Sequence, residues 1–218
     1  SRYASTLIIS DPLPNSTSTT LPPSTLSAIT AAKKLHDGPI TLLLLSLESP
    51  SEVPEDVETV LLADTKEGGE GAELLAENAA AAVTMAQEKG GYSHIVAAAN
   101  KFGGNFLPRV GGLLGVQPVT DVIEILGEDT FVRPMYAGNV LAKVKSNGTP
   151  QIISIRPPSF EKTTSPLSPP KATETIKPPS QSQSKWLCQN VSQSERPDLS
   201  SASVVISGGR GMQNGENF

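Results

Sequence analysis

Apolar residues form short runs along the first 156 residues, and their spacing alternates between that of strands and that of helices. Continuous aliphatic or β-branched runs are typical of strands buried on both faces, and recurrence every three or four residues is typical of helices. The expected strands cover residues 5–9, 40–45, 59–63 and 94–98. The expected helices cover residues 24–32, 71–89 and 105–114. This alternation predicts an α/β domain built on a mainly parallel sheet.

Three details of this pattern make specific predictions. The Ala-rich helix over 71–89 should end at Gly90 and Gly91. Pro108 should lie in the first turn of its helix, where a missing N–H is tolerated. The strands at 40–45 and 59–63 are joined by only about a dozen residues that include Pro50 and Pro54, so we expect a crossover without a helix.

After residue 115 the pattern changes to short β runs at 119–126, 130–136, 140–145 and 151–155. Turn signals rich in Gly, Asn and Asp separate them, which is typical of hairpins. The expected fold is therefore a three-layer, mainly parallel, Rossmann-like sheet with an antiparallel extension.

Residues 157–184 are rich in Pro, Ser and Thr and hold much of the chain's excess of proline, 19 residues in 218. Such a composition buries too little apolar surface to offset the entropy of ordering. We expect a semi-rigid, extended linker. It divides the chain into an α/β domain at 1–156 and a C-terminal part at 185–218.

The C-terminal part contains a β run at 204–206 followed by a glycine-rich turn, which we interpret as the opening of a second α/β domain. Gly209, Gly211 and Gly215 have a spacing close to the dinucleotide-binding pattern, and Arg210 adds a cation suited to phosphate. On spacing alone, a simple loop is an equally good interpretation.

Composition excludes several functions. A net charge of −5 argues against a general nucleic-acid or anionic-membrane binder. A single cysteine, Cys188, excludes an internal disulfide and a cysteine-cluster metal site, and we interpret it as a small hydrophobe. His36 and His94 are interpreted as structural, and no Ser-His-Asp or HExxH set is visible. We therefore expect no catalytic residues, no metal site and no enzyme activity.

Three ordered sequence blocks resemble the electron-transfer flavoprotein α subunit family. They are KFGGNFLPRV at 101–110, VTDV at 119–122 and FVRPMYAGN at 131–139. The run at 5–9 and the helix at 28–32 are similar to the same family. So is the tail, with RPDL at 196–199 and SGGRG at 207–211. The resemblance covers nearly all of the chain.

The resemblance implies an electron carrier rather than an enzyme. In that family the α subunit forms a heterodimer with a β subunit, which also holds an AMP. FAD lies mainly on the C-terminal α domain, while the domain that matches residues 1–156 is scaffold and subunit interface. Electrons pass from acyl-CoA dehydrogenases to a membrane quinone reductase during fatty-acid beta-oxidation and amino-acid oxidation. The implied location is the mitochondrial matrix or, alternatively, the bacterial cytoplasm.

Only Arg210 matches a family position that contacts FAD, and Gly208, Gly209 and Gly211 would permit a tight turn beside it. The resemblance places Arg109, Arg133 and Tyr136 in the scaffold domain as packing and ion-pairing groups. The FAD domain stops after its first strand and turn, so we expect a fragment that does not hold FAD by itself.

Two other functions stay open. One is a flavin-free interaction module that binds a β-like subunit through the scaffold domain. The other is an adenine-nucleotide-binding α/β domain, although residues 1–156 show no convincing phosphate loop.

Overall fold

The computed structural model describes residues 4–12, 20–65, 71–179, 184–188 and 204–217. The chain divides into two compact units, Ser1–Cys188 and Gln189–Phe218. The first unit holds a seven-stranded sheet in the order β12-β4-β2-β1-β5-β10-β6, with every neighbouring pair parallel. Its strands are β1 (Thr6–Ile9), β2 (Ile40–Leu44), β4 (Val57–Ala63), β5 (His94–Ala98), β6 (Val119–Val122), β10 (Gln151–Ile155) and β12 (Ala172–Ile176).

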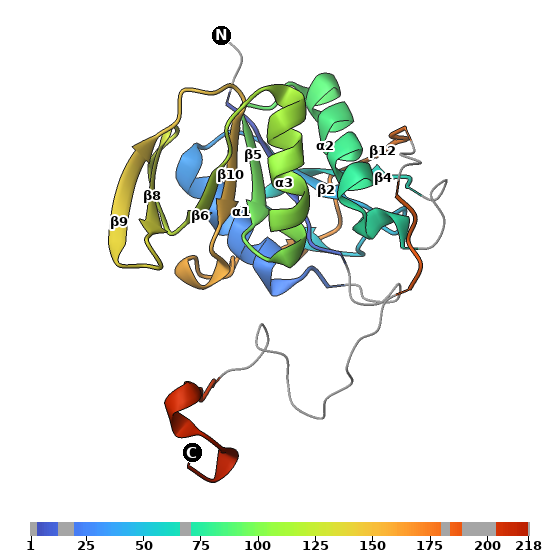
Figure 1. Ribbon diagram of the computed structural model, residues 1–218. Coiled ribbons are helices and arrows are strands. Elements are labelled where there is room, and N and C mark those ends of the chain that lie inside the picture. Colours follow the sequence, from blue (N-terminus) through green and yellow to red (C-terminus); the bar gives the residue numbers. More distant parts are fainter. Residues whose placement is uncertain (1–3, 13–19, 66–70, 180–183, 189–203, 218) are drawn as a thin grey trace. The chain divides into compact units, whose positions relative to one another are not determined.

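Helices cover both faces of this sheet (Figure 1). Helix α1 (Pro23–Leu35) packs on one face, and α2 (Ala76–Gly90) and α3 (Lys101–Leu114) pack on the other. Successive residues of a strand point to opposite faces. In β1, Ile8 therefore joins the core under α1, whereas Leu7 and Ile9 join the core under α2 and α3. The predicted three-layer α/β architecture is confirmed.

The antiparallel strands form two small separate sheets. One contains β7 (Glu124–Gly127), β8 (Thr130–Met135) and β9 (Val140–Lys145), and the other pairs β3 (Val53–Pro54) with β11 (Leu167–Ser168). The β run at 151–155, which we expected beside the hairpin strands, instead lies inside the parallel sheet between β5 and β6. Its residues Ile152, Ile153 and Ile155 are fully buried, which suits a central parallel strand. The short crossover from β2 to β4 contains β3 and no helix, as predicted.

Two helix starts differ from the predictions. A 3₁₀ turn (Ala72–Leu74) precedes α2, which begins at Ala76 rather than at 71 and ends, as expected, at the left-handed Gly91. Helix α3 begins at Lys101 because the Asn100 side chain accepts a hydrogen bond from the Gly103 amide at 2.9 Å. Pro108 is therefore inside the helix, not in its first turn. Burial of the neighbouring Phe106, Leu107 and Val110 offsets the lost backbone hydrogen bond.

The prediction of a solvated linker at 157–184 is corrected for the described residues 157–179. After a 3₁₀ turn (Pro157–Ser159), the chain adds β11 and then β12, which pairs in parallel with β4 along its whole length. Phe160 and Ile176 are buried at 3 % and 6 % exposure. The prolines flank β12 without interrupting it, so its backbone is free to pair. We call residues 157–177 the strap.

The second unit is described at 204–217 and contains two 3₁₀ turns, Arg210–Met212 and Gly215–Asn217. The strand predicted at 204–206 is wrong in the described structure, where Val204, Val205 and Ile206 are between 53 % and 82 % exposed. A strand needs a neighbour for its backbone hydrogen bonds, and the described part of this unit supplies none. In the first unit, Trp186–Leu187–Cys188 is not helical, and Cys188 is exposed.

Candidate functional site

Arg210 opens a 3₁₀ turn in the second unit and is exposed. Gly209 before it has extended backbone (φ −85°, ψ −179°), and a Cβ at Gly209 or Gly211 would meet open space. The only residue with a positive φ described in this unit is Gln213. The expected tight turn that needs glycine is therefore corrected.

The first unit contains a hollow lined by the end of β8, the turn that joins β8 to β9, and Arg156. It measures about 510 Å³. We call it the hairpin hollow, and its lining consists of Arg133, Pro134, Met135, Tyr136, Ala137, Gly138 and Arg156. Sequence reasoning did not find this site, because Arg156 comes from the end of β10 and meets the hairpin only in the folded chain.

The hairpin extends beyond the core at the β6 edge of the main sheet (Figure 1). Near its base, Phe131 of β8 is fully buried opposite Val144 of β9. Further along the same face, Met135 is paired with Val140, and these side chains are 40 % and 46 % exposed. On this face the strand pairing therefore places Arg133, opposite Ala142, between the buried Phe131 and the exposed Met135.

Two guanidinium groups give the hairpin hollow positive charge. Arg133 donates through Nη2 to Thr120 Oγ1 at 2.9 Å, while its buried Nε has no acceptor in the described part of the chain. Arg156 forms a loose ion pair with Asp121, 3.7 Å between nitrogen and oxygen. Packing and ion-pairing roles were predicted for Arg133 and Tyr136, but among the described residues Arg133 has a hydrogen bond and no ion pair, and Tyr136 does not pack. It is 76 % exposed at the tip.

Arg109 lies away from the hairpin hollow on α3. Its guanidinium is 3.7 Å from the Glu77 carboxylate at the start of α2, so it joins two helices, in line with the predicted ion-pairing role. The pKa of Glu77 is lowered mainly by a hydrogen bond from its own backbone, and desolvation opposes this shift. The Ser184 hydroxyl and the Arg109 charge lower the pKa further.

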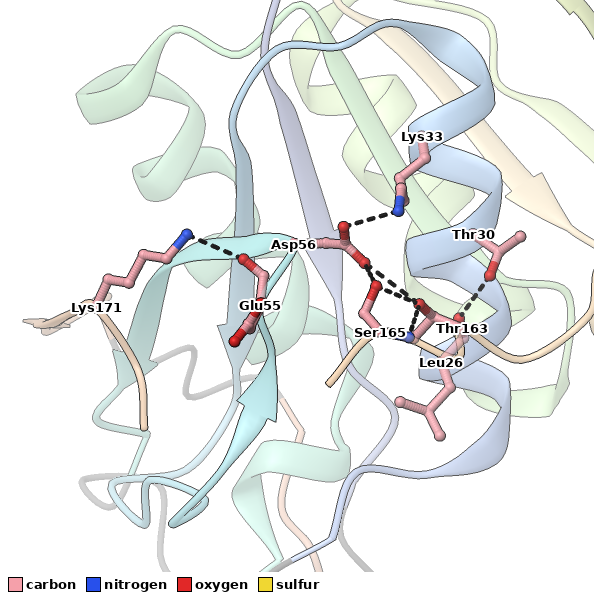
Figure 2. Close-up of polar contacts among 8 residues, drawn as sticks. All are labelled: Leu26, Thr30, Lys33, Glu55, Asp56, Thr163, Ser165 and Lys171. Atoms are coloured by element: carbon pink, nitrogen blue, oxygen red, sulfur yellow. Dashed lines mark hydrogen bonds and ion pairs between the residues drawn. The ribbon is translucent and has the colours of Figure 1, made fainter. Parts of the chain in front are cut away.

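Asp56, in the turn before β4, anchors the strap through a polar cluster (Figure 2). Lys33 of α1 pairs with the carboxylate at 2.8 Å, and the hydroxyls of Ser165 and Thr163 donate to its other oxygen. Burial opposes ionisation of Asp56, but the hydrogen bonds from Lys33 and Ser165 outweigh it and lower its pKa. We call these four residues the latch. All its groups are partnered within the chain, so it is a structural device.

The two histidines were assigned to separate elements by sequence, and the fold places their rings 5.1 Å apart. His36 Nδ1 accepts from the Gly38 amide at 2.9 Å, and His94 Nε2 donates to the Glu128 carbonyl at 2.8 Å. Desolvation is the main cause that lowers the pKa of each, and the nearby His94 lowers that of His36 further. Both rings are thus partly desolvated and hydrogen-bonded within the chain, which fits the structural role predicted for them.

Within the described residues, no group of three or more His, Cys, Asp or Glu is arranged to hold a metal ion. In the same part of the chain, no helix is long and apolar enough to cross a bilayer.

Comparison with known proteins gives a consistent result. A family model described as "Electron transfer flavoprotein domain" matches residues 15–184. The chain is similar to the mitochondrial electron transfer flavoprotein subunit alpha of Arabidopsis thaliana, with 39 % identity over 100 % of this chain and 63 % of the relative. It is also similar to the subunit alpha of Pseudomonas aeruginosa, with 34 % identity over 89 % of this chain and 63 % of the relative.

A probable mitochondrial subunit alpha of Caenorhabditis elegans is 35 % identical over 100 % of this chain and 65 % of its own length. The chain spans less than two thirds of the length of these relatives. The family model covers most of the chain, and the relatives align with nearly all of it. The chain therefore belongs to the electron transfer flavoprotein family.

Proposed function

We propose that this chain acts as part of an electron transfer flavoprotein α subunit, in a heterodimer with a β subunit. The heterodimer carries electrons through FAD from acyl-CoA dehydrogenases to a quinone reductase in fatty-acid and amino-acid oxidation. The observation that carries the proposal is the similarity to relatives named subunit alpha along 89–100 % of the chain. A role as carrier rather than enzyme is consistent with the family name.

We place the protein in the mitochondrial matrix. The relatives from Arabidopsis thaliana and Caenorhabditis elegans are both named mitochondrial. The Pseudomonas aeruginosa relative supports the alternative of a bacterial cytoplasm.

In this proposal the first unit is scaffold and subunit interface, and residues 185–218 begin the FAD-binding part. When bound, FAD supplies the reversible uptake and release of electrons. Arg210 would hold a phosphate oxygen of FAD, because its guanidinium is exposed and can donate two parallel hydrogen bonds to such an anion. None of the other described residues is assigned to the cofactor.

Co-expression tests the proposal. The full chain carries an affinity tag and is produced with the electron transfer flavoprotein β subunit encoded in the same genome. We expect the two subunits to elute together. A yellow complex with flavin absorbance supports the electron carrier, whereas a colourless complex overturns FAD binding by this chain and favours the flavin-free interaction module. Recovery of the chain without the β subunit would overturn the heterodimer itself.

Arg210→Gln sharpens the cofactor part of this test. We expect the flavin-to-protein absorbance ratio of the purified complex to fall, because the phosphate loses a cationic partner. Lys101→Gln is the matched control, since it removes an exposed cation from α3 in the first unit. An equal loss of flavin in both variants would show that Arg210 has no specific role.

A further inference from the structure

The β7–β9 sheet exposes a concentration of large apolar side chains. Leu126, Met135, Tyr136, Val140 and Leu141 are 40–76 % exposed. A single exposed apolar residue needs no explanation, but a contiguous group on one element marks an interaction surface. Met135 and Val140 form such a group, because they pair across the β8–β9 ladder on one face of the hairpin, next to Tyr136 at the tip, whereas Leu141 belongs to the opposite face.

The tip of this hairpin has a fixed conformation that costs free energy. Tyr136 and Ala137 have positive φ angles of 51° and 55°, a region that non-glycine residues enter at a cost of about 1–2 kcal/mol each. The turn is closed by hydrogen bonds from the Gly138 amide to Met135 O and from the Asn139 amide to Tyr136 O. It therefore presents the Tyr136 ring on a defined, preorganised turn.

The hairpin hollow has an excess of positive charge in a chain whose net charge is −5. Arg133 and Arg156 both line it, and their only acidic partner in the described residues is Asp121, at 3.7 Å from Arg156. The guanidinium of Arg156 is about half exposed. The two groups keep donor capacity that a carboxylate could use in a bidentate manner.

We propose that the hairpin hollow binds the partner subunit, through a carboxylate side chain flanked by apolar residues. The carboxylate lies against Arg156 and Arg133, and the apolar residues cover Met135 and Tyr136. Tyrosine and arginine anchors beside apolar contacts are the usual composition of energetically dominant interface positions. This inference rests on the proposed heterodimer, because it takes the β subunit as the occupant.

The test measures the affinity of the tagged full chain for the purified β subunit. Tyr136→Ala and Arg156→Gln are each expected to raise the Kd at least about tenfold, as loss of an interface anchor does. Arg156→Gln should also reduce the weakening of binding by added salt, because the carboxylate contact is screened by salt. Two matched controls, Leu113→Ala and Lys101→Gln, alter an exposed apolar residue and an exposed cation on α3 and should stay within about twofold of wild type.

The outcomes separate this inference from the function on which it rests. If the wild-type chain does not bind the β subunit, the heterodimer proposal fails. If the wild-type chain binds and both hairpin variants bind equally well, the hairpin inference alone is wrong. It is also wrong if light scattering shows that the chain alone forms dimers that Tyr136→Ala dissociates, because the occupant is then a second copy. Thermal melting of each variant checks that the fold is retained.

Discussion

The two edges of the main sheet are finished in opposite ways. At the β4 edge the strap adds β12 to the sheet, and the polar groups of the latch find their partners within the chain. At the β6 edge the β8–β9 hairpin extends past the core and leaves apolar side chains and two guanidinium groups accessible. The strap, whose polar groups are partnered within its own chain, serves stability, whereas the exposed apolar side chains and guanidinium groups of the hairpin are available to a partner.

The largest expected effect comes from truncating Phe160, the buried aromatic side chain of the strap. Phe160→Ala should lower the free energy of unfolding by about 3 kcal/mol, because the ring is 3 % exposed in the core beside α1. Leu167→Ala, in the same strap but 56 % exposed, should change it by less than about 0.5 kcal/mol. Urea unfolding of both variants measures the difference. Equal values would mean that the strap contributes little to the core.

The latch should have the next largest effect. Asp56→Asn removes the negative charge that pairs with Lys33 and accepts hydrogen bonds from the two strap hydroxyls. We expect the free energy of unfolding to fall by about 1–2 kcal/mol. Hydrogen exchange should quicken in β12, which the latch holds beside β4. Glu161→Gln, an exposed carboxylate in the strap, is the control. If hydrogen exchange in β12 is unchanged, the latch does not contribute to the pairing of β12 with β4.

The latch also sets a pH dependence. Its Asp56 has a pKa below the usual value, so the unfolded state binds more protons in the acid range. The stabilisation is present above the unfolded pKa of an aspartate and is lost as the pH falls through the lower pKa of the folded state. Asp56→Asn should abolish this part of the acid destabilisation, as measured by unfolding at a series of pH values below 5.

The parallel sheet could be predicted because its strands are continuous aliphatic runs, as at 40–45, where the sequence pattern and the burial agree. The strap could not, since a run such as Ala172–Ile176 has only one buried residue and gains its order from pairing with β4. The hairpin hollow was missed for a similar reason. Its residues follow ordinary strand patterns, and only the folded chain brings Arg156 to Arg133.

A smaller pH effect is expected at the hairpin edge. His94 donates a hydrogen bond to the Glu128 carbonyl in the β7–β8 turn, and its ring lies 5.1 Å from the tilted ring of His36. Desolvation lowers the pKa of both rings, and the carboxylates of Glu128 and Asp37 offset it only in part. The unfolded state therefore binds more protons as the pH falls below about 6.5, and stability declines there. Unfolding free energies between pH 8 and 5.5 should show this slope, and His36→Gln with His94→Gln should flatten it. An unchanged slope in the double variant would contradict the assignment.

The smallest predicted change tests the conformation of the hairpin tip. Ala137 has a φ of 55°, a conformation that glycine adopts without strain. Ala137→Gly should therefore relieve strain in the folded state, but it also raises the conformational entropy of the unfolded state. We expect the net effect to be a stabilisation of the isolated chain by about 0.5 kcal/mol. Ala142→Gly, in the middle of β9, should destabilise it by a similar amount. Thermal melting of the two variants under the same conditions shows whether each substitution stabilises or destabilises the chain. If Ala137→Gly stabilises the chain but weakens binding of the β subunit, then the strain at the tip is retained because it holds Tyr136 in the orientation that a partner needs.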